Sequence, residues 1–181
     1  MKSRFDEVKA TQLAGLLLKK SGNQMNILKL MKLMYLIDRE SLVRWGWSMT
    51  GDSYVAMPKG MVLSRTYNLV NEESFPPSFW KTAISSPENY KVNLLIEPGF
   101  DEFSEAEIEL IDEMYEKFGN RNQWFLVDEV HHKLPEWIDP DGSSIPVEYK
   151  AVLKGSGKTE QEMYEILSEL EELAMFERLA S

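Results

Sequence analysis

Apolar residues recur at helical spacing in the first part of the chain. A helix is predicted over residues 4–20, with Gly22 just beyond its end. Its apolar stripe consists of Phe5, Val8, Leu13, Leu16 and Leu17. Residues 27–37 are apolar at nearly every position, and Asn26 can cap a helix that starts there. Because such a helix has little room for a solvent-facing side, we expect it at the centre of the fold.

The pattern changes after Gly46. Residues 47–57, WSMTGDSYVAM, alternate between apolar and polar side chains and contain a turn signal at residues 50–53. This pattern predicts a short β-hairpin. A third helix is expected to begin soon after residues 58–60 and to run to about Val70.

Residues 71–100 cannot hold a long helix, because prolines interrupt them. These prolines are Pro76, Pro77, Pro87 and Pro98. The segments 79–84 (FWKTAI) and 90–97 (YKVNLLIE) have the composition of strands. They are expected either to pair with each other or to join the hairpin in a small sheet.

Helical patterns return in the last part of the chain. Ser104 with Glu107 and Thr159 with Glu162 have the spacing of capping boxes at the starts of two helices. Gly119 is expected to end the first of these. Two more helices are expected over residues 122–133 and 145–153. The predicted fold is therefore mainly α (α+β) and close to all-α, with a small antiparallel β-hairpin or sheet.

Length and composition limit the possible classes of protein. A chain of 181 residues suits a single domain, 1–181, with one sizeable core. The chain has no cysteine, which excludes thiol catalysis and thiolate metal sites and fits a reducing compartment. The first residues lack the pattern of a signal peptide, and no apolar run reaches the roughly 20 residues of a membrane span. We therefore expect a cytoplasmic protein.

The net charge of −10 is unevenly distributed. Residues 1–50 carry nine basic and four acidic side chains, a net +5, and residues 51–100 carry four and five, a net −1. Residues 101–181 carry seven and twenty-one, a net −14. The basic first part could form a basic face, although a solvated helix surface is the simpler interpretation. The acidic last part suits a basic partner.

Residues 28–67 combine an apolar helix bearing one acid, the polar string TGDSY and a glycine-marked segment. This order resembles the pattern KLLYLxDxxHL…G…TGDxYxAxxxGPV…Y of the Panacea domain in SocA-like antitoxins. Met61 departs from the family proline. A second block, residues 103–137, resembles the C-terminal half of that domain, and the resemblance extends over residues 5–170. The matching positions are Lys32, Leu33, Tyr35, Asp38, Leu42, Gly46, Thr50, Gly51, Asp52, Tyr54, Ala56, Gly60, Val62, Tyr67, His132, Pro135 and Trp137.

The resemblance implies an antitoxin, including phage-associated members, that binds and neutralises a cognate protein toxin encoded beside it. Neutralisation by direct complex formation needs no chemical step and no cofactor. The same surface could instead deliver the toxin to an ATP-dependent protease. A transcriptional autoregulator is disfavoured, because no separate helix-turn-helix with a basic recognition helix is present. Neither nucleic acid nor a membrane is expected as a partner.

Asp38 is the most informative single residue, because it shares a helix face with core methionines. A carboxylate there is costly to bury unless donors satisfy it, and the turn at residues 50–53 or Arg65 could provide them. A structural clamp is the favoured interpretation, and direct partner contact is the alternative. Tyr35 and Tyr67 are expected to belong to the same clamp.

The other candidates have less specific patterns. Trp45 and Trp47 flank Gly46 and are candidate partner contacts, although each alone is more typical of a core residue. Trp124 is expected in the core. His131 and His132 point about 100° apart on a helix, so they cannot chelate one metal well. The remaining motif positions with an expected role in partner binding or in the motif itself are Asp52, Tyr54, Gly60, His132 and Trp137.

Two local patterns suggest catalysis or nucleotide binding. Asp128 and His132 have the i, i+4 spacing of a charge pair or an acid–base dyad, which is the basis of the alternative of a small enzyme. A structural pair is favoured. The string GSGKT at residues 155–159 lacks the glycine that a phosphate-binding loop requires, because that position is Val152. It is expected to be a connection and a helix cap.

Overall fold

The computed structural model describes residues 5–71 and 78–180. The predicted helix start at residue 4, and Pro76 and Pro77, lie outside these ranges. Most of the described chain is helical. The helices are α1 (Glu7–Lys20), α2 (Ile27–Trp45), α3 (Ser64–Asn71), α4 (Phe79–Ala83), α5 (Glu105–Phe118), α6 (Gln123–Phe125), α7 (Tyr149–Gly155) and α8 (Glu160–Ala180). After α6 the chain continues as a π turn, Leu126–Val130, and a 3-10 turn, His131–Lys133.

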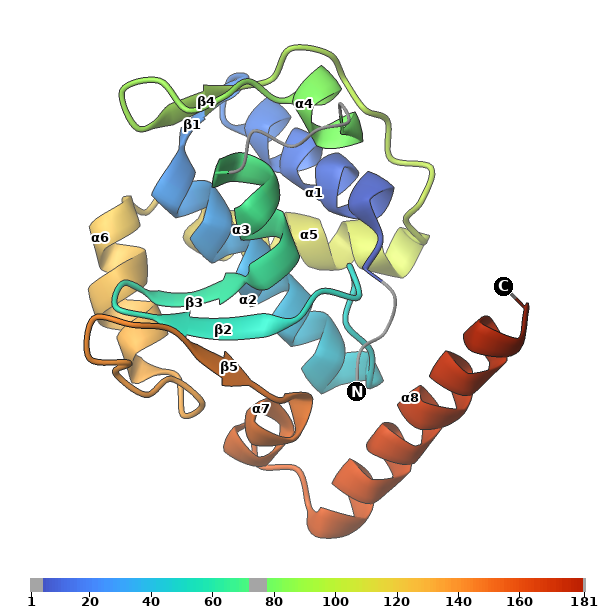
Figure 1. Cartoon of the computed structure of the whole chain (residues 1–181). Helices are drawn as coiled ribbons and strands as arrows, with labels where there is room; N and C mark the ends of the chain where they lie inside the picture. Colours follow the sequence, from blue (N-terminus) through green and yellow to red (C-terminus); the bar gives the residue numbers. More distant parts are fainter. Residues whose placement is uncertain (1–4, 72–77, 181) are drawn as a thin grey trace.

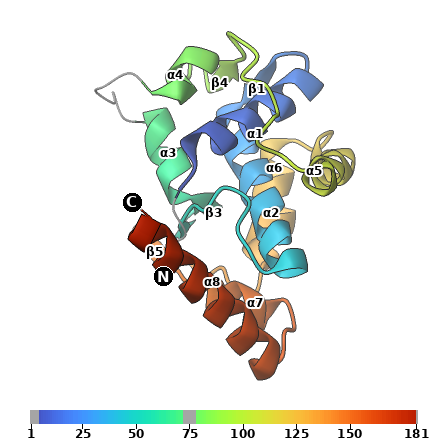
Figure 2. The same ribbon diagram turned by 90° about the vertical axis from the view of Figure 1, so that its right-hand side faces the viewer.

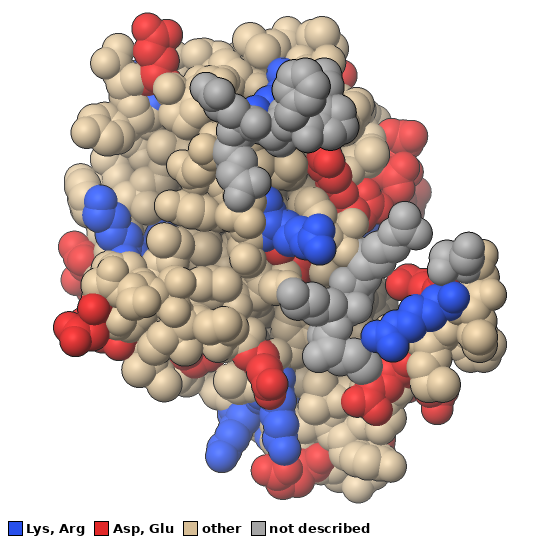
Figure 3. Space-filling view, viewed as in Figure 1, with Lys and Arg blue, Asp and Glu red and all other residues tan. Residues whose placement is uncertain are grey.

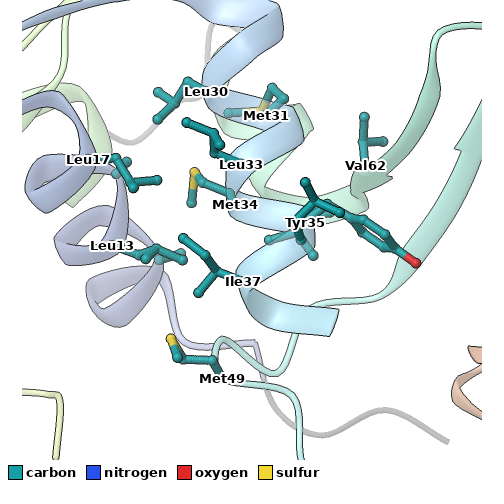
Figure 4. Packing of buried hydrophobic residues seen from close by; sticks show 14 of the residues in the cluster. Leu13, Leu17, Leu30, Met31, Leu33, Met34, Tyr35, Ile37, Met49 and Val62 are labelled. Carbon is teal, nitrogen blue, oxygen red and sulfur yellow. The ribbon is translucent and has the colours of Figure 1, made fainter. Parts of the chain in front are cut away.

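Helix α2 lies at the centre of the molecule, with α1, α3, α5 and a β-hairpin around it (Figure 1). Its Asn26 cap accepts a hydrogen bond from the amide of Leu28, and Gly46 ends the helix in the left-handed conformation. Figure 4 shows the packing between α1 and α2. Each leucine buried there adds about 1.5–3 kcal/mol to the free energy of unfolding. The labelled residues at this contact are Leu13, Leu17, Leu30, Leu33, Met34 and Ile37, whereas Met31 and Tyr35 lie on the side of α2 that faces the hairpin.

Most predicted helices are confirmed together with their caps. Ser104 and Glu107 form the complete capping box of α5, and Thr159 with Glu162 does the same for α8. The string GSGKT links α7 to α8, as expected, with Gly157 at a φ of +90°. The helix predicted over residues 122–133 is present, divided into α, π and 3-10 turns.

The predicted hairpin is displaced along the chain. Strands β2 (Tyr54–Met57) and β3 (Gly60–Leu63) pair antiparallel around a turn at residues 58–59, not at residues 50–53. Residues 50–53 form a loop, because their polar groups bond to carboxylates rather than across a hairpin. Gly60 begins β3 instead of leading into a helix, and α3 starts later than expected.

Of the two strands expected in residues 79–97, the second is confirmed in part and the first is wrong. Segment 79–84 forms α4, which the hydroxyl of Ser78 caps, and only Ile84 makes an isolated bridge to Leu94. Strand β4 (Lys91–Asn93) pairs with β1 (Gln24–Asn26) and not with the hairpin. The two segments therefore pair only at the Ile84–Leu94 bridge, and the pairing of β4 with β1 was not predicted because it depends on contacts between distant segments.

Segment 145–153 was predicted to be one helix but begins as a strand. Strand β5 (Ile145–Val147) pairs with β2, so that β2 lies between β3 and β5, and α7 follows. With two antiparallel sheets the fold is mainly helical α+β, and the description all-α is not correct.

Helix α8 lies at the outer edge of the molecule, beside α7 (Figures 1 and 2). Met163 and Ala174 are its buried residues. Ile166 lies so close to the end of α2 that a Cβ added at Gly46 would come within 3.3 Å of it. Across residues 5–71 and 78–180, none of the helices combines the length and apolar character needed to cross a membrane.

Candidate functional site

The carboxylate of Asp38 joins α2 to the chain that precedes the hairpin. It is completely buried. Its Oδ1 accepts hydrogen bonds from the amide and the hydroxyl of Thr50, at 2.8 and 2.7 Å. Its Oδ2 accepts from the hydroxyls of Ser48 and Tyr54, at 2.7 and 2.6 Å. These four bonds hold the loop and the start of β2 against α2.

Burial raises the pKa of Asp38, and the hydrogen bonds from Ser48, Tyr54 and Thr50 oppose that shift. Of the two donor sources expected from the sequence, the segment around residues 50–53 is the correct one. Arg65 is not a donor to Asp38. Its amide bonds to Asp52, and its guanidinium lies 6.0 Å from the centre of the Phe5 ring.

Asp52 likewise joins the loop before the hairpin to the start of α3. Its carboxylate accepts from the amides of Ser53 and Arg65 and from the amide and hydroxyl of Thr66, all within 2.9 Å. A carboxylate at this position satisfies amides that the first turn of a helix leaves unpaired. The hydroxyl of Tyr149 donates to the carbonyl oxygen of Asp52 at 2.6 Å, which ties α7 to the same loop.

Tyr35 lies beside the Asp38 cluster but bonds elsewhere. Its ring packs edge-on against Tyr54, with 5.1 Å between the centres, and its hydroxyl donates to Glu136 at 2.8 Å. Arg39 also bonds to the buried carboxylate of Glu136, at 2.6 and 3.2 Å. Sequence reasoning missed Glu136 and Arg39. Their only signal in the sequence is their position. Arg39 directly follows Asp38, and Glu136 lies between the motif residues Pro135 and Trp137.

A buried lysine and a buried histidine hold the first residues of β3. Lys32 Nζ donates to the carbonyl oxygen of Met61 at 2.9 Å, and the amide of Met61 donates to His131 Nδ1 at 3.2 Å. His131 Nε2 lies 3.2 Å from the carbonyl oxygen of Lys32, which fixes the proton on Nε2. Burial, with a contribution from Lys59, lowers the pKa of Lys32 to about 7.

No role was expected for His131 from the sequence, but its position explains why residue 60 is a glycine. A Cβ at Gly60 would lie 2.5 Å from His131 Cβ, and the φ of Gly60 is +97°. Burial and the charge of Lys32 lower the pKa of His131 well below its usual value, so the ring is neutral. Gly60 is therefore required by the close approach of a buried ring.

His132 and Trp137 contact the turn of the hairpin on its outer side. His132 Nε2 lies 3.0 Å from the carbonyl oxygen of Pro58, and Trp137 Nε1 donates to that of Met57 at 3.0 Å. The two rings pack with 4.2 Å between their centres. Asp128 is exposed, and its Oδ1 lies 3.7 Å from His132 Nδ1, which is a loose contact.

A groove of about 710 Å³ opens beside the hairpin turn, between the start of α2, α3 and α6. Tyr67 lines this groove and is not one of the hydrogen-bond donors to Asp38. Trp124, which was expected in the core, is 51% exposed and also lines it, with Lys59 Nζ 5.5 Å from the centre of its ring. The remaining walls are mostly apolar and include Met31, Val62, Val70 and Tyr90.

Trp45 and Trp47 lie at the end of α2, where Ser41 Oγ binds the carbonyl oxygen of Trp47. The two rings stack with 5.8 Å between their centres, and Trp47 is 47% exposed. They are separate from the His132 and Trp137 pair. The motif residues therefore divide into buried clamps and exposed aromatic side chains.

The buried polar groups of this region serve to join elements. Asp38, Asp52 and Glu136 each accept several hydrogen bonds from the protein itself. In the described residues, no three His, Asp or Glu side chains gather in a way that could hold a metal ion. The arrangement thus builds a rigid support for the hairpin and presents a groove next to it.

A model of the family described as "Antitoxin SocA-like, Panacea domain" matches residues 30–138. This range is narrower than residues 5–170, over which the resemblance was expected, but it contains Lys32, Asp38, Asp52 and Glu136. Comparisons with curated proteins and with solved structures found no match.

Proposed function

Because the chain belongs to the family of SocA-like antitoxins with a Panacea domain, we propose that it binds and neutralises a cognate protein toxin encoded beside it. The single observation that carries this proposal is the family match over residues 30–138. That range includes the Asp38 and Asp52 clamps, the hairpin and most of the groove. The proposal places the pair in the cytoplasm and includes phage-borne gene pairs.

Neutralisation in this proposal is occlusion of the toxin by complex formation, with no chemical step and no cofactor. The buried carboxylates support a scaffold role, since their oxygens are occupied by donors of the same chain. Exposed aromatic side chains such as Trp47 and Trp124 are of the kind that anchors protein interfaces. The loose contact between Asp128 and His132 gives no support to the enzyme alternative.

The test is co-expression of this chain with the product of the adjacent gene in a host that the product inhibits. We expect growth to be restored and the two proteins to co-purify in a fixed ratio. Rescue without any physical association would contradict occlusion.

A second measurement separates occlusion from delivery to a protease. Toxin abundance should be the same in hosts with and without their ATP-dependent proteases. Rescue that disappears in the protease-deficient host, together with a stable toxin level there, would favour the adaptor mechanism.

A further inference from the structure

Helix α8 carries large apolar side chains that nothing in the described chain covers. Over its last turns Leu173, Met175, Phe176 and Leu179 are 59, 61, 71 and 83% exposed. A group of large exposed apolar side chains bordered by charged residues is typical of a surface that binds another protein. The exposed surface is therefore a candidate interface.

One face of α8 is already packed against the rest of the protein. Met163 and Ala174 face inward, and Ile166 packs against the end of α2 at Gly46. The exposed residues Met175, Phe176 and Leu179 lie on other sides of the helix than this inner face. The exposed apolar residues of the last turns thus stay accessible while the inner face of α8 remains packed.

Charge identifies the kind of partner. Residues 160–180 contain seven glutamates and one arginine, a net −6. Figure 3 shows acidic side chains along this helix. Two copies packed through α8 would bring two such charges together, and nucleic acid and anionic lipid would be repelled as well. A protein with an apolar patch bordered by Lys and Arg is complementary in both respects.

We propose that α8 is an arm that binds a basic, apolar patch on the toxin. This inference rests on the proposed function. Because the arm lies outside residues 30–138, it is not part of what identifies the family. We infer that α8 adds affinity for one particular toxin to whatever contacts the Panacea region makes.

The experiment measures binding of the full chain to the immobilised product of the adjacent gene. Phe176→Ser combined with Leu179→Ser should weaken binding tenfold or more, mostly through faster dissociation. Leu95→Ser combined with Ile96→Ser is the matched control. These residues are 57 and 63% exposed and closely follow β4, which lies far from α8 in Figure 1, so their replacement should leave binding unchanged.

Charge-reversal variants test the electrostatic contribution of α8. Glu169→Lys with Glu172→Lys, both exposed on α8, should slow association and reduce its dependence on salt. Glu109→Lys with Glu116→Lys changes the net charge equally on α5 and should have a much smaller effect. Equal effects of the two pairs would mean that only total charge matters, and the arm would be refuted.

The outcomes separate the two proposals. If the wild-type chain binds and neutralises the gene product while the α8 variants bind equally well, the arm is wrong and the antitoxin proposal stands. If the wild-type chain does not bind at all, both fail. If the chain alone sediments as a dimer that Phe176→Ser with Leu179→Ser dissociates, α8 binds a second copy and the inference is overturned.

Discussion

At the scale of single residues, replacement of Asp38 should destabilise the protein strongly. Asp38→Ala leaves Ser48, Thr50 and Tyr54 with unpaired buried donors, and we expect a loss of about 2–4 kcal/mol in the free energy of unfolding. Toxin neutralisation should also fail, because the hairpin is displaced. Denaturant titration and the co-expression assay measure the two effects.

A double-mutant comparison checks the partners of Asp38. Tyr54→Phe should be clearly non-additive with Asp38→Ala, since the two residues share a hydrogen bond. Arg65→Ala should be additive within about 0.5 kcal/mol, because its side chain lies near Phe5 instead. An Asp38→Ala protein with unchanged stability that cannot bind toxin would place Asp38 in the interface.

Lys32 should make stability depend on pH. It remains charged to about pH 10.4 when unfolded but only below about pH 7 when folded. Between these values the unfolded chain binds more protons, so the free energy of unfolding should rise with pH, by at most about 1.4 kcal/mol per unit. Conversely, this stability is lost as the pH falls to 7. Denaturant titrations at pH 7, 8 and 9 measure the slope.

Lys32→Met should remove most of that slope. A small part should remain, because burial also lowers the pKa of Lys29. Lys59→Met, which removes an exposed amine from the same groove, should keep most of the slope. The titrations stop at pH 9 because burial raises the pKa values of Tyr35 and Tyr54. These two tyrosines would therefore lower the free energy of unfolding above pH 10 and obscure the effect of Lys32. A slope that Lys32→Met leaves intact would show that Lys32 is not its source.

His132 tests the enzyme alternative. His132→Gln keeps a polar group near the carbonyl oxygen of Pro58, so it should cost at most about 1 kcal/mol and preserve neutralisation. Elemental analysis of the purified protein should find no stoichiometric metal. A folded His132→Gln protein without any neutralising activity would instead support a functional pair with Asp128.

Some of the site could be foreseen from single residues, and some could not. Burial of Asp38 among donors follows from its place on an apolar helix face, because an unsatisfied carboxylate there would be too costly. Glu136 and His131 could not be predicted, since each bonds to residues about 70 to 100 positions away and no local pattern records such pairs.

At the scale of elements, Gly60 determines how closely the hairpin approaches the 3-10 turn. Gly60→Ala combines a positive φ with a Cβ 2.5 Å from His131, and we expect a loss of about 2–5 kcal/mol. Gly142→Ala is the control, because its φ is +78° but nothing lies within 4 Å of the new Cβ. It should cost only about 1–2 kcal/mol. Similar losses for the two variants would show that contact with His131 has little effect.

Helices were easier to predict than strands because their signals are local. The capping boxes at Ser104 and Thr159 and the left-handed Gly46 need only neighbouring residues. The string TGDSY has the composition of a turn, but its polar groups bond to other elements. Thr50 donates to Asp38 on α2, and Asp52 accepts from Thr66 on α3. These tertiary hydrogen bonds hold residues 50–53 in a loop, and the hairpin forms at residues 54–63 instead.

At the scale of the whole molecule, stability should be uneven. The exposed last turns of α8 have few buried contacts, whereas α2 is buried at every position from Leu30 to Asp38. Hydrogen exchange should therefore show α8 amides after residue 171 opening at about 1–2 kcal/mol, and those of α2 only at the global free energy of unfolding. Binding of the toxin should protect the former. Equal protection of both helices in the free protein would contradict this gradient.

The pairing of β5 with β2 also matters for solubility. Without β5, the N–H and C=O groups along one side of Tyr54–Met57 would form an open edge, which is a template for aggregation between molecules. With three residues, one of them Pro146, β5 is itself a poor template for another strand. A fragment that stopped at residue 138 would lose this cover. We expect such a fragment to aggregate even though it retains the whole matched region.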